Sequence, residues 1–253
     1  MPGQSFRGFA ERVALVTCGA RGVGRAVALQ LALEGAFVVV THAPEDVEGA
    51  RVLNELREMG TLAFAVGGDV SRGEDVARVF RTIEESFGRL DLLVNVGWAV
   101  RDVPLGDLTE AAWDESLAAT LKSAFLCSRA ALRLMSKRPA PAIVNVASEA
   151  GMTGTFGGAD AVAAHAGLVG LTKALARELA PRIRVNCVAS GARHGGGTDD
   201  AGASISVDEA RLVGSPVART RDPAPDEVAR AVVYLLSPEA ASITGQTLVV
   251  GVR

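Results

Sequence analysis

The chain has 253 residues, of which 49% are apolar and only 4% aromatic, and its formal net charge is −3. A chain of this length can bury one large core, and so few aromatic residues are typical of a core of Ala, Val, Leu and Ile around a parallel sheet. Charges of both signs are spread along the sequence, which argues against a nucleic acid or a membrane surface as the main partner.

The first residues, MPGQSFRGFAERVALVT, contain no apolar segment long enough for a signal peptide, and no run of about 18 apolar residues occurs anywhere. The three cysteines, Cys18, Cys127 and Cys187, are odd in number and widely spaced. This pattern favours inert buried thiols in a reducing compartment over a disulfide framework or a zinc site. We therefore expect a cytoplasmic protein with no metal site.

Short β-branched runs alternate with longer helical patterns along the chain. The runs lie at 12–17, 36–41, 62–70, 90–96, 141–148, 183–189 and 247–250. Segments between them repeat apolar residues at helical spacing. Strict alternation predicts right-handed βαβ units, and therefore an α/β fold: a Rossmann-type doubly wound parallel sheet of seven strands with helices on both faces. We expect one domain over 1–253, with a mobile substrate-loop region at 190–222.

A glycine-rich turn follows the first run in TCGARGVGRAVALQLA, with Gly19, Gly22 and Gly24 leading into a helix. Glycines here let the backbone approach a pyrophosphate, which the free N–H groups and positive dipole end of the helix then hold. Ligands of such sheets bind beyond the carboxyl ends of the strands. The turn therefore predicts a nucleotide site at that edge.

Several segments in order give the chain a family resemblance. VTCGARGVG, GGDVS, LDLLVN, WDESL, IVNVAS, GLVGLTKALARELAP, IRVNCVASG and SITGQTLVV resemble the short-chain dehydrogenase/reductases of the classical type, from about residue 10 onward. The resemblance implies an NAD(P)-dependent oxidoreductase that forms dimers or tetramers. The helical segments 113–135 and 164–179 resemble the pair of helices through which that family dimerises.

The resemblance also implies which residues contact a dinucleotide. They are Gly19, Arg21, Gly22, Val23, Gly24, His42, Asp69, Val70, Asn95, Gly97 and Gly191. If a dinucleotide binds at all, NADP(H) is favoured over NAD(H), because Arg21 is a cation where a 2′-phosphate could lie and His42 stands where NAD-using relatives carry an acidic residue. The alternative is that these residues are inherited and that binding is weak or lost.

The cofactor residues also depart from the family pattern. Cys18 takes the place of the first glycine, where a positive φ would make a β-carbon cost on the order of 1–2 kcal/mol. In the segment NVGW, either Trp98 replaces a glycine that lies against the cofactor or Gly97 takes that role after a deletion. After the sixth run, Ser190-Gly191 replaces Pro-Gly and Gly195 replaces a threonine.

The four catalytic positions of the family are mostly substituted. Its tyrosine falls on Ala161, its lysine on His165 and its asparagine on Thr120, while its serine is kept as Ser148. A lost general acid costs roughly 10²–10⁴ in rate. We therefore expect a chain without redox catalysis of its own, either a structural or regulatory subunit beside an active paralogue or a ligand-binding protein. The alternative is an active, non-standard NADP(H)-dependent oxidoreductase, or a lyase or hydrolase that uses Ser148 and His165.

Four interpretations of His165 remain open. The ring is an inherited substitution satisfied by water or a backbone carbonyl, or it hydrogen-bonds a ribose or another ligand in place of the lysine. It could also serve as a general base near Ser148, because imidazole titrates near pH 6.5. The fourth is a metal ligand with His194 and Asp199 or Asp200, although no close ligand spacing supports it.

Overall fold

The computed structural model describes residues 8–97, 103–135, 138–155, 158–191 and 223–251. These residues form a seven-stranded sheet of order β3-β2-β1-β4-β5-β6-β7, in which every pair of neighbouring strands is parallel. The strand order reverses between β1 and β4, which creates the crevice where doubly wound sheets bind their ligands. The predicted Rossmann-type fold is confirmed.

The strands are short, and their side chains are buried on both faces of the central sheet, as parallel strands under helices require. Their bounds are β1 Val13–Val16, β2 Phe37–His42, β3 Ala63–Gly67, β4 Leu92–Val96, β5 Ala142–Ser148, β6 Arg184–Ser190 and β7 Thr247–Val250.

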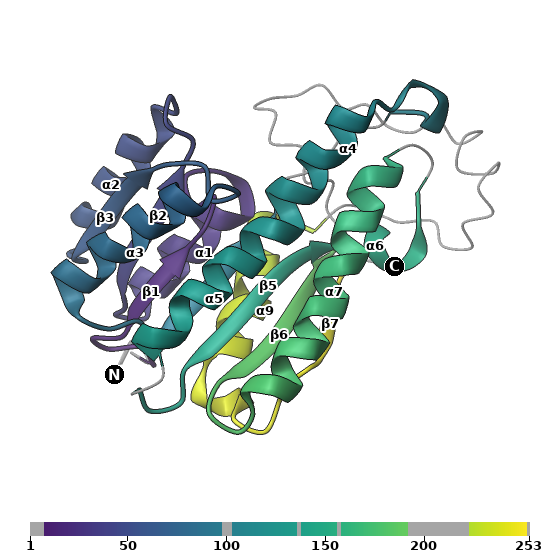
Figure 1. Cartoon of the computed structure of the whole chain (residues 1–253). Helices are drawn as coiled ribbons and strands as arrows, with labels where there is room; N and C mark the ends of the chain where they lie inside the picture. The colour runs from purple at the N-terminus through teal and green to yellow at the C-terminus, as the bar shows by residue number, and fades with distance from the viewer. Residues whose placement is uncertain (1–7, 98–102, 136–137, 156–157, 192–222, 252–253) are drawn as a thin grey trace.

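Helices cover the two faces of the sheet in separate layers, each with its own hydrophobic cluster. Figure 1 shows α5 and α7 in front of the sheet and α9 behind it. One layer contains α1 (Gly22–Leu33), α2 (Glu48–Glu58) and α9 (Pro225–Leu236). The other contains α3 (Gly73–Phe87), α5 (Ser123–Met135) and α7 (Ala159–Leu179), and the short α6 spans Ala150–Thr153.

The helical segment expected at 113–135 has an internal irregularity. It comprises α4 (Glu110–Leu117), a π-helical segment η2 (Ala118–Lys122) and α5. The Ser123 hydroxyl lies 2.6 Å from the Ala119 carbonyl oxygen and 3.2 Å from that of Thr120, and such back-bonding is a known cause of helix distortion. Wide turns of this kind are frequent at functional sites, and this one contains Thr120.

The described residues include no helix long and apolar enough to cross a membrane. They also contain no group of three or more His, Cys, Asp or Glu side chains placed to hold a metal ion. His194, Asp199, Asp200 and Gly195 lie outside the described residues, as does nearly all of the expected substrate-loop region.

Candidate functional site

The glycine-rich turn connects β1 to α1 at the carboxyl edge of the sheet. Its backbone is tight: a β-carbon on Gly24 would come within 2.2 Å of the Cys18 carbonyl oxygen. Gly22 has φ +48 and open space around its α-carbon. Cys18 has φ +49, so a β-carbon does occupy a left-handed position there, with the strain that the sequence suggested.

The turn fits the pyrophosphate of a dinucleotide. Helix α1 begins at Gly22, and in the described residues neither a side-chain cap nor an acidic residue occupies its first turn. Its first N–H groups and its positive dipole end therefore remain available to an anion. Strand β2 holds the turn in place, because the Cys18 N–H donates to the Thr41 hydroxyl (3.1 Å) and the Gly19 N–H donates to the Thr41 carbonyl (2.9 Å).

The end of β2 places two of the expected cofactor residues beside the turn. Arg21 forms a bidentate ion pair with Asp46, from the connection between β2 and α2. His42 ends β2, and its ring fills the space over Gly49, where a β-carbon would come within 2.4 Å of it. Sequence reasoning missed Asp46, because nothing in the sequence pairs two residues that are 25 positions apart.

Asp69 and Val70 follow β3. The Asp69 carboxylate accepts the N–H of Ser71 and remains at the surface, while Val70 is buried in the hydrophobic cluster of the front layer. Because Val70 is part of the core, Asp69 is the one of the two whose side chain can contact a ligand.

Near the end of β4, the side chain of Asn95 is buried and hydrogen-bonded within the protein. Its side-chain amide donates to Ser128 (3.1 Å) and to the Asn145 oxygen (2.9 Å), and Asn145 donates to Thr172 (2.9 Å). Gly97 lies against Thr120, because a β-carbon on it would meet the Thr120 methyl at 2.7 Å. Trp98 is outside the described residues.

Ser148 and His165 lie together at the end of β5. The backbone N–H of Ser148 donates to Nδ1 of His165 (3.2 Å), and the ring is only 1% exposed. The Ser148 hydroxyl instead accepts the N–H of Ala150 (3.2 Å). Because Nδ1 accepts a hydrogen bond, the neutral ring carries its proton on Nε2. Ala161, one turn earlier on α7, is half-buried.

A second polar pair, which the sequence analysis missed, lies beside these positions. Ser116 of α4 donates a hydrogen bond to Asp160 of α7, and both are buried. Asp160 precedes Ala161, so the pair fixes the start of α7 against α4 next to the tyrosine position of the family. An acidic residue within an otherwise apolar helix face was its only sequence signal.

The remaining expected site residue, Gly191, lies at the same edge. It follows β6, and its N–H donates to the Val250 carbonyl of β7 (2.8 Å).

The three cysteines have no disulfide partner, and burial raises the pKa of Cys18 to about 11 and the pKa of Cys127 and Cys187 to about 12. They are therefore protonated at neutral pH, which agrees with the expectation of inert thiols.

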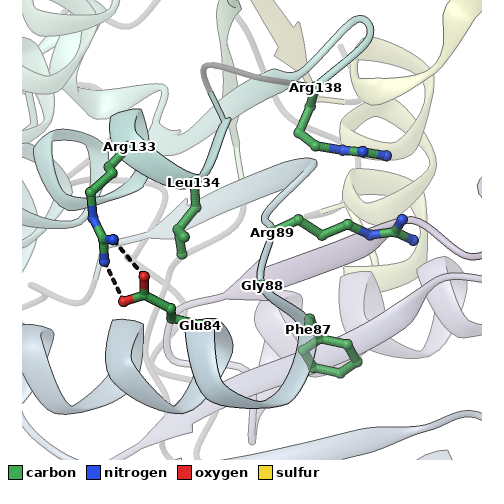
Figure 2. Close-up of a pocket in the computed structure, with 7 residues that line it drawn as sticks. All are labelled: Glu84, Phe87, Gly88, Arg89, Arg133, Leu134 and Arg138. Atoms are coloured by element: carbon green, nitrogen blue, oxygen red, sulfur yellow. Dashed lines mark hydrogen bonds and ion pairs between the residues drawn. The ribbon is translucent and has the colours of Figure 1, made fainter.

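A cavity of about 540 Å³ lies at the opposite, amino edge of the sheet, between the connections that follow α3 and α5. Figure 2 shows Glu84 and Arg133 facing each other across it as a bidentate pair. Two other lining residues, Arg89 and Arg138, reach the buried carboxylate of Asp91. This cavity is separate from the candidate site. The Glu84–Arg133 pair joins α3 to α5, and the Arg138–Asp91 pair joins the connections that follow these helices.

Comparisons with known proteins agree with this geometry. A family model described as enoyl-(acyl carrier protein) reductase matches residues 19–252. The 3-oxoacyl-[acyl-carrier-protein] reductase FabG of Staphylococcus aureus is 38% identical over 93% of this chain and 94% of its own, and a reductase of the same description from Synechocystis is also 38% identical. A short-chain dehydrogenase from Burkholderia cenocepacia, solved in complex with NADP, has a TM-score of 0.85 and 31% identity, with 98% of each chain covered.

The expectation of a subunit or ligand-binding protein without redox catalysis is wrong, because these relatives at 36–38% identity over nearly the whole chain carry the names of reductases. A missing proton donor lowers a rate but leaves the glycine-rich turn and Ser148 in place, so the substitution of the tyrosine does not by itself exclude a reductase. With the sheet order, the turn and the full-length matches in agreement, the chain belongs to the short-chain dehydrogenase/reductase family, classical type.

Proposed function

We propose that the protein is an NADP(H)-dependent reductase that reduces the ketone of a 3-oxoacyl thioester to a hydroxyl group. The observation that carries the proposal is the position of the Ser148 hydroxyl at the end of β5, on the same edge as the glycine-rich turn. The names of the 38%-identical relatives supply the substrate class, and the NADP-bound neighbour supports the cofactor.

The protein's own residues bind and orient the reactants. The turn at Gly22 and the start of α1 would hold the pyrophosphate of a dinucleotide, which would supply the hydride for the carbonyl carbon when bound. Since the Ser148 oxygen accepts the Ala150 N–H, its own proton is directed toward another acceptor, and we assign that role to the substrate oxygen.

His165 positions Ser148. Its ring accepts the Ser148 N–H and thereby fixes the backbone at the end of β5. The same hydrogen bond argues against a hydrolase or lyase with a Ser148–His165 pair. A neutral ring with Nδ1 occupied and a proton on Nε2 has no lone pair left to take the serine proton.

The product hydroxyl needs one proton on its oxygen, which family members with a tyrosine take from the phenol. Here Ala161 has no such proton, so we assign the source to solvent water at the substrate oxygen, while Ser148 holds that oxygen. The chemical step is expected to be slower than with a tyrosine, by roughly 10²–10⁴.

Two measurements test the proposal. NADPH is titrated into the protein while cofactor fluorescence is followed, and the oxidation of NADPH is then recorded with a 3-oxoacyl thioester. We expect saturable binding and turnover, and we expect Ser148→Ala to lower kcat about 10²-fold while the Kd for NADPH stays within about twofold.

Thr153→Ala is the matched control, because it removes a nearby exposed hydroxyl of α6 that donates to the local carbonyl oxygens of Glu149 and Gly154. It should leave kcat within about twofold of the wild type. Absence of NADPH binding up to millimolar concentration would overturn the proposed function.

A further inference from the structure

The cation in the glycine-rich turn is already paired within the protein. Nε of Arg21 donates to Oδ2 of Asp46 at 3.0 Å, and Nη2 donates to Oδ1 at 2.7 Å. This is the bidentate arrangement in which Arg binds carboxylates most strongly. The sum of the two charges is zero, so the turn does not present the isolated positive charge that its sequence indicates.

Asp46 is held in place from a second direction. Its Oδ1 also accepts the N–H of Glu48 (3.0 Å), the first residue of α2. The Asp46 side chain is 15% exposed and that of Arg21 is 36% exposed. The hydrogen bond from Arg21 lowers the pKa of Asp46, so this carboxylate stays ionised at neutral pH.

The pair lies between the glycine-rich turn and the end of β2, where doubly wound sheets receive the adenosine ribose of a dinucleotide. An acidic side chain there favours the free 2′-hydroxyl of NAD(H), while an arginine accommodates the 2′-phosphate of NADP(H). This chain has one of each, bonded to each other. His42, the neighbouring titratable group on β2, is turned away, with Nδ1 2.8 Å from the Ala43 carbonyl oxygen and the ring over Gly49.

We propose that Asp46 is a specificity-determining residue, which neutralises Arg21 and so narrows the preference of the protein for NADP(H) over NAD(H). This inference rests on the proposed function, since it requires that a dinucleotide binds. Arg21 still has three N–H donors outside the pair, so a 2′-phosphate can bind to it. The phosphate must then lie close to a fixed carboxylate, which repels it.

The test removes the charge of Asp46 and keeps its shape. Asp46→Asn retains an oxygen that can accept from Arg21 or from the Glu48 N–H. The Kd values of NADPH and NADH are measured by fluorescence or calorimetric titration, without substrate or turnover. We expect NADPH to bind roughly tenfold more tightly, NADH to change less than about twofold, and the gain for NADPH to shrink as ionic strength rises.

Glu48→Gln is the matched control. Glu48 is an acidic residue two positions away whose carboxylate lies 3.6 Å from Arg51, and in the described residues it makes no side-chain hydrogen bond to Arg21. Its charge contributes to the raised pKa of Arg21 less than the Asp46 hydrogen bond does, so Glu48→Gln should change the ratio of the two Kd values much less than Asp46→Asn. Thermal melts of all variants establish that each is folded under the conditions of the titration.

The outcomes separate the two proposals. If the wild type binds either dinucleotide and Asp46→Asn leaves the ratio of Kd values within twofold, the role of Asp46 is refuted and the proposed function stands. An equal change in Glu48→Gln also refutes it, because the effect is then one of general surface charge. If neither dinucleotide binds up to millimolar concentration, both proposals fail.

Discussion

At the scale of single residues, the contrast between Ser148 and Ala161 dominates the candidate site. Ser148 lies at the end of β5, while Ala161 and His165 are the residues that the sequence predicts at the tyrosine and lysine positions of the family. Ala161 is half-buried, so its side chain is not sealed within the core. The site therefore lacks a group, and its supporting backbone is present.

Restoring the missing pair should increase activity. In the double variant Ala161→Tyr/His165→Lys, a phenol beside a cation can donate the proton. The variant also removes the ring that accepts the Ser148 N–H, and we expect the gain of a proton donor to outweigh that loss, so that kcat for reduction of a 3-oxoacyl thioester rises roughly 10²-fold. The measurement is steady-state oxidation of NADPH across pH. The control Ala161→Phe/His165→Lys adds the ring without its hydroxyl and should show no gain. Equal rates in the two double variants would contradict the prediction.

At the scale of elements, the buried residue Asp91 joins neighbouring segments at the amino edge of the sheet through its carboxylate and its backbone. It is 1% exposed, accepts the N–H of Val13 (2.9 Å) and Nε of Arg138 (2.7 Å), and lies 3.6 Å from Nε of Arg89. The backbone carbonyl of Asp91 accepts the N–H of Ala142 at the start of β5 (3.1 Å). The carboxylate thus ties β1, β4 and the connection to β5 together.

Asp91→Asn should therefore destabilise the fold. Removing one partner of a buried charge pair leaves the other partners imperfectly satisfied, and we expect the free energy of unfolding to fall by about 3 kcal/mol, measured by urea denaturation. Glu84→Gln is the comparison, because its side chain is 42% exposed in its pair with Arg133 and should cost less than about 1 kcal/mol. A similar fall in the free energy of unfolding of both variants would show that the burial of Asp91 does not account for the destabilisation.

The elements also show what the sequence could and could not predict. Periodicity predicted the seven strands and the helical segment at 164–179, which the structure extends to Ala159–Leu179, because both follow from local patterns of burial. The π-helical turn at Thr120 depends on a hydroxyl that bonds back to the preceding turn, which periodicity does not encode. Asn95 matches a cofactor motif, yet its amide bonds to residues 33 and 50 positions away. Long-range pairs such as these decide which matched residues face a ligand.

At the scale of the whole molecule, the two edges of the sheet have different roles. The carboxyl edge has the glycine-rich turn, Ser148 and the Arg21–Asp46 pair, whereas the amino edge has the ion pairs around Asp91. A third feature is an apolar groove formed by α4, η2 and α5 beside α7. Its lining includes Leu117, Leu121, Phe125 and Leu171. Figure 1 shows these helices on one side of the sheet.

The family resemblance implies an oligomer formed through these helices, and the exposure of their side chains agrees with it. Phe125 is 42% exposed, and the guanidinium of Arg129 lies over its ring at 5.0 Å. A charge placed there would have to be buried in the interface, so Phe125→Glu should convert the oligomer into monomers in size-exclusion chromatography with light scattering. Met59→Glu, at a similarly exposed position (38%) at the end of α2, should leave the mass unchanged. A wild-type mass equal to that of one chain would exclude the oligomer. An unchanged oligomer in Phe125→Glu would place the contact elsewhere.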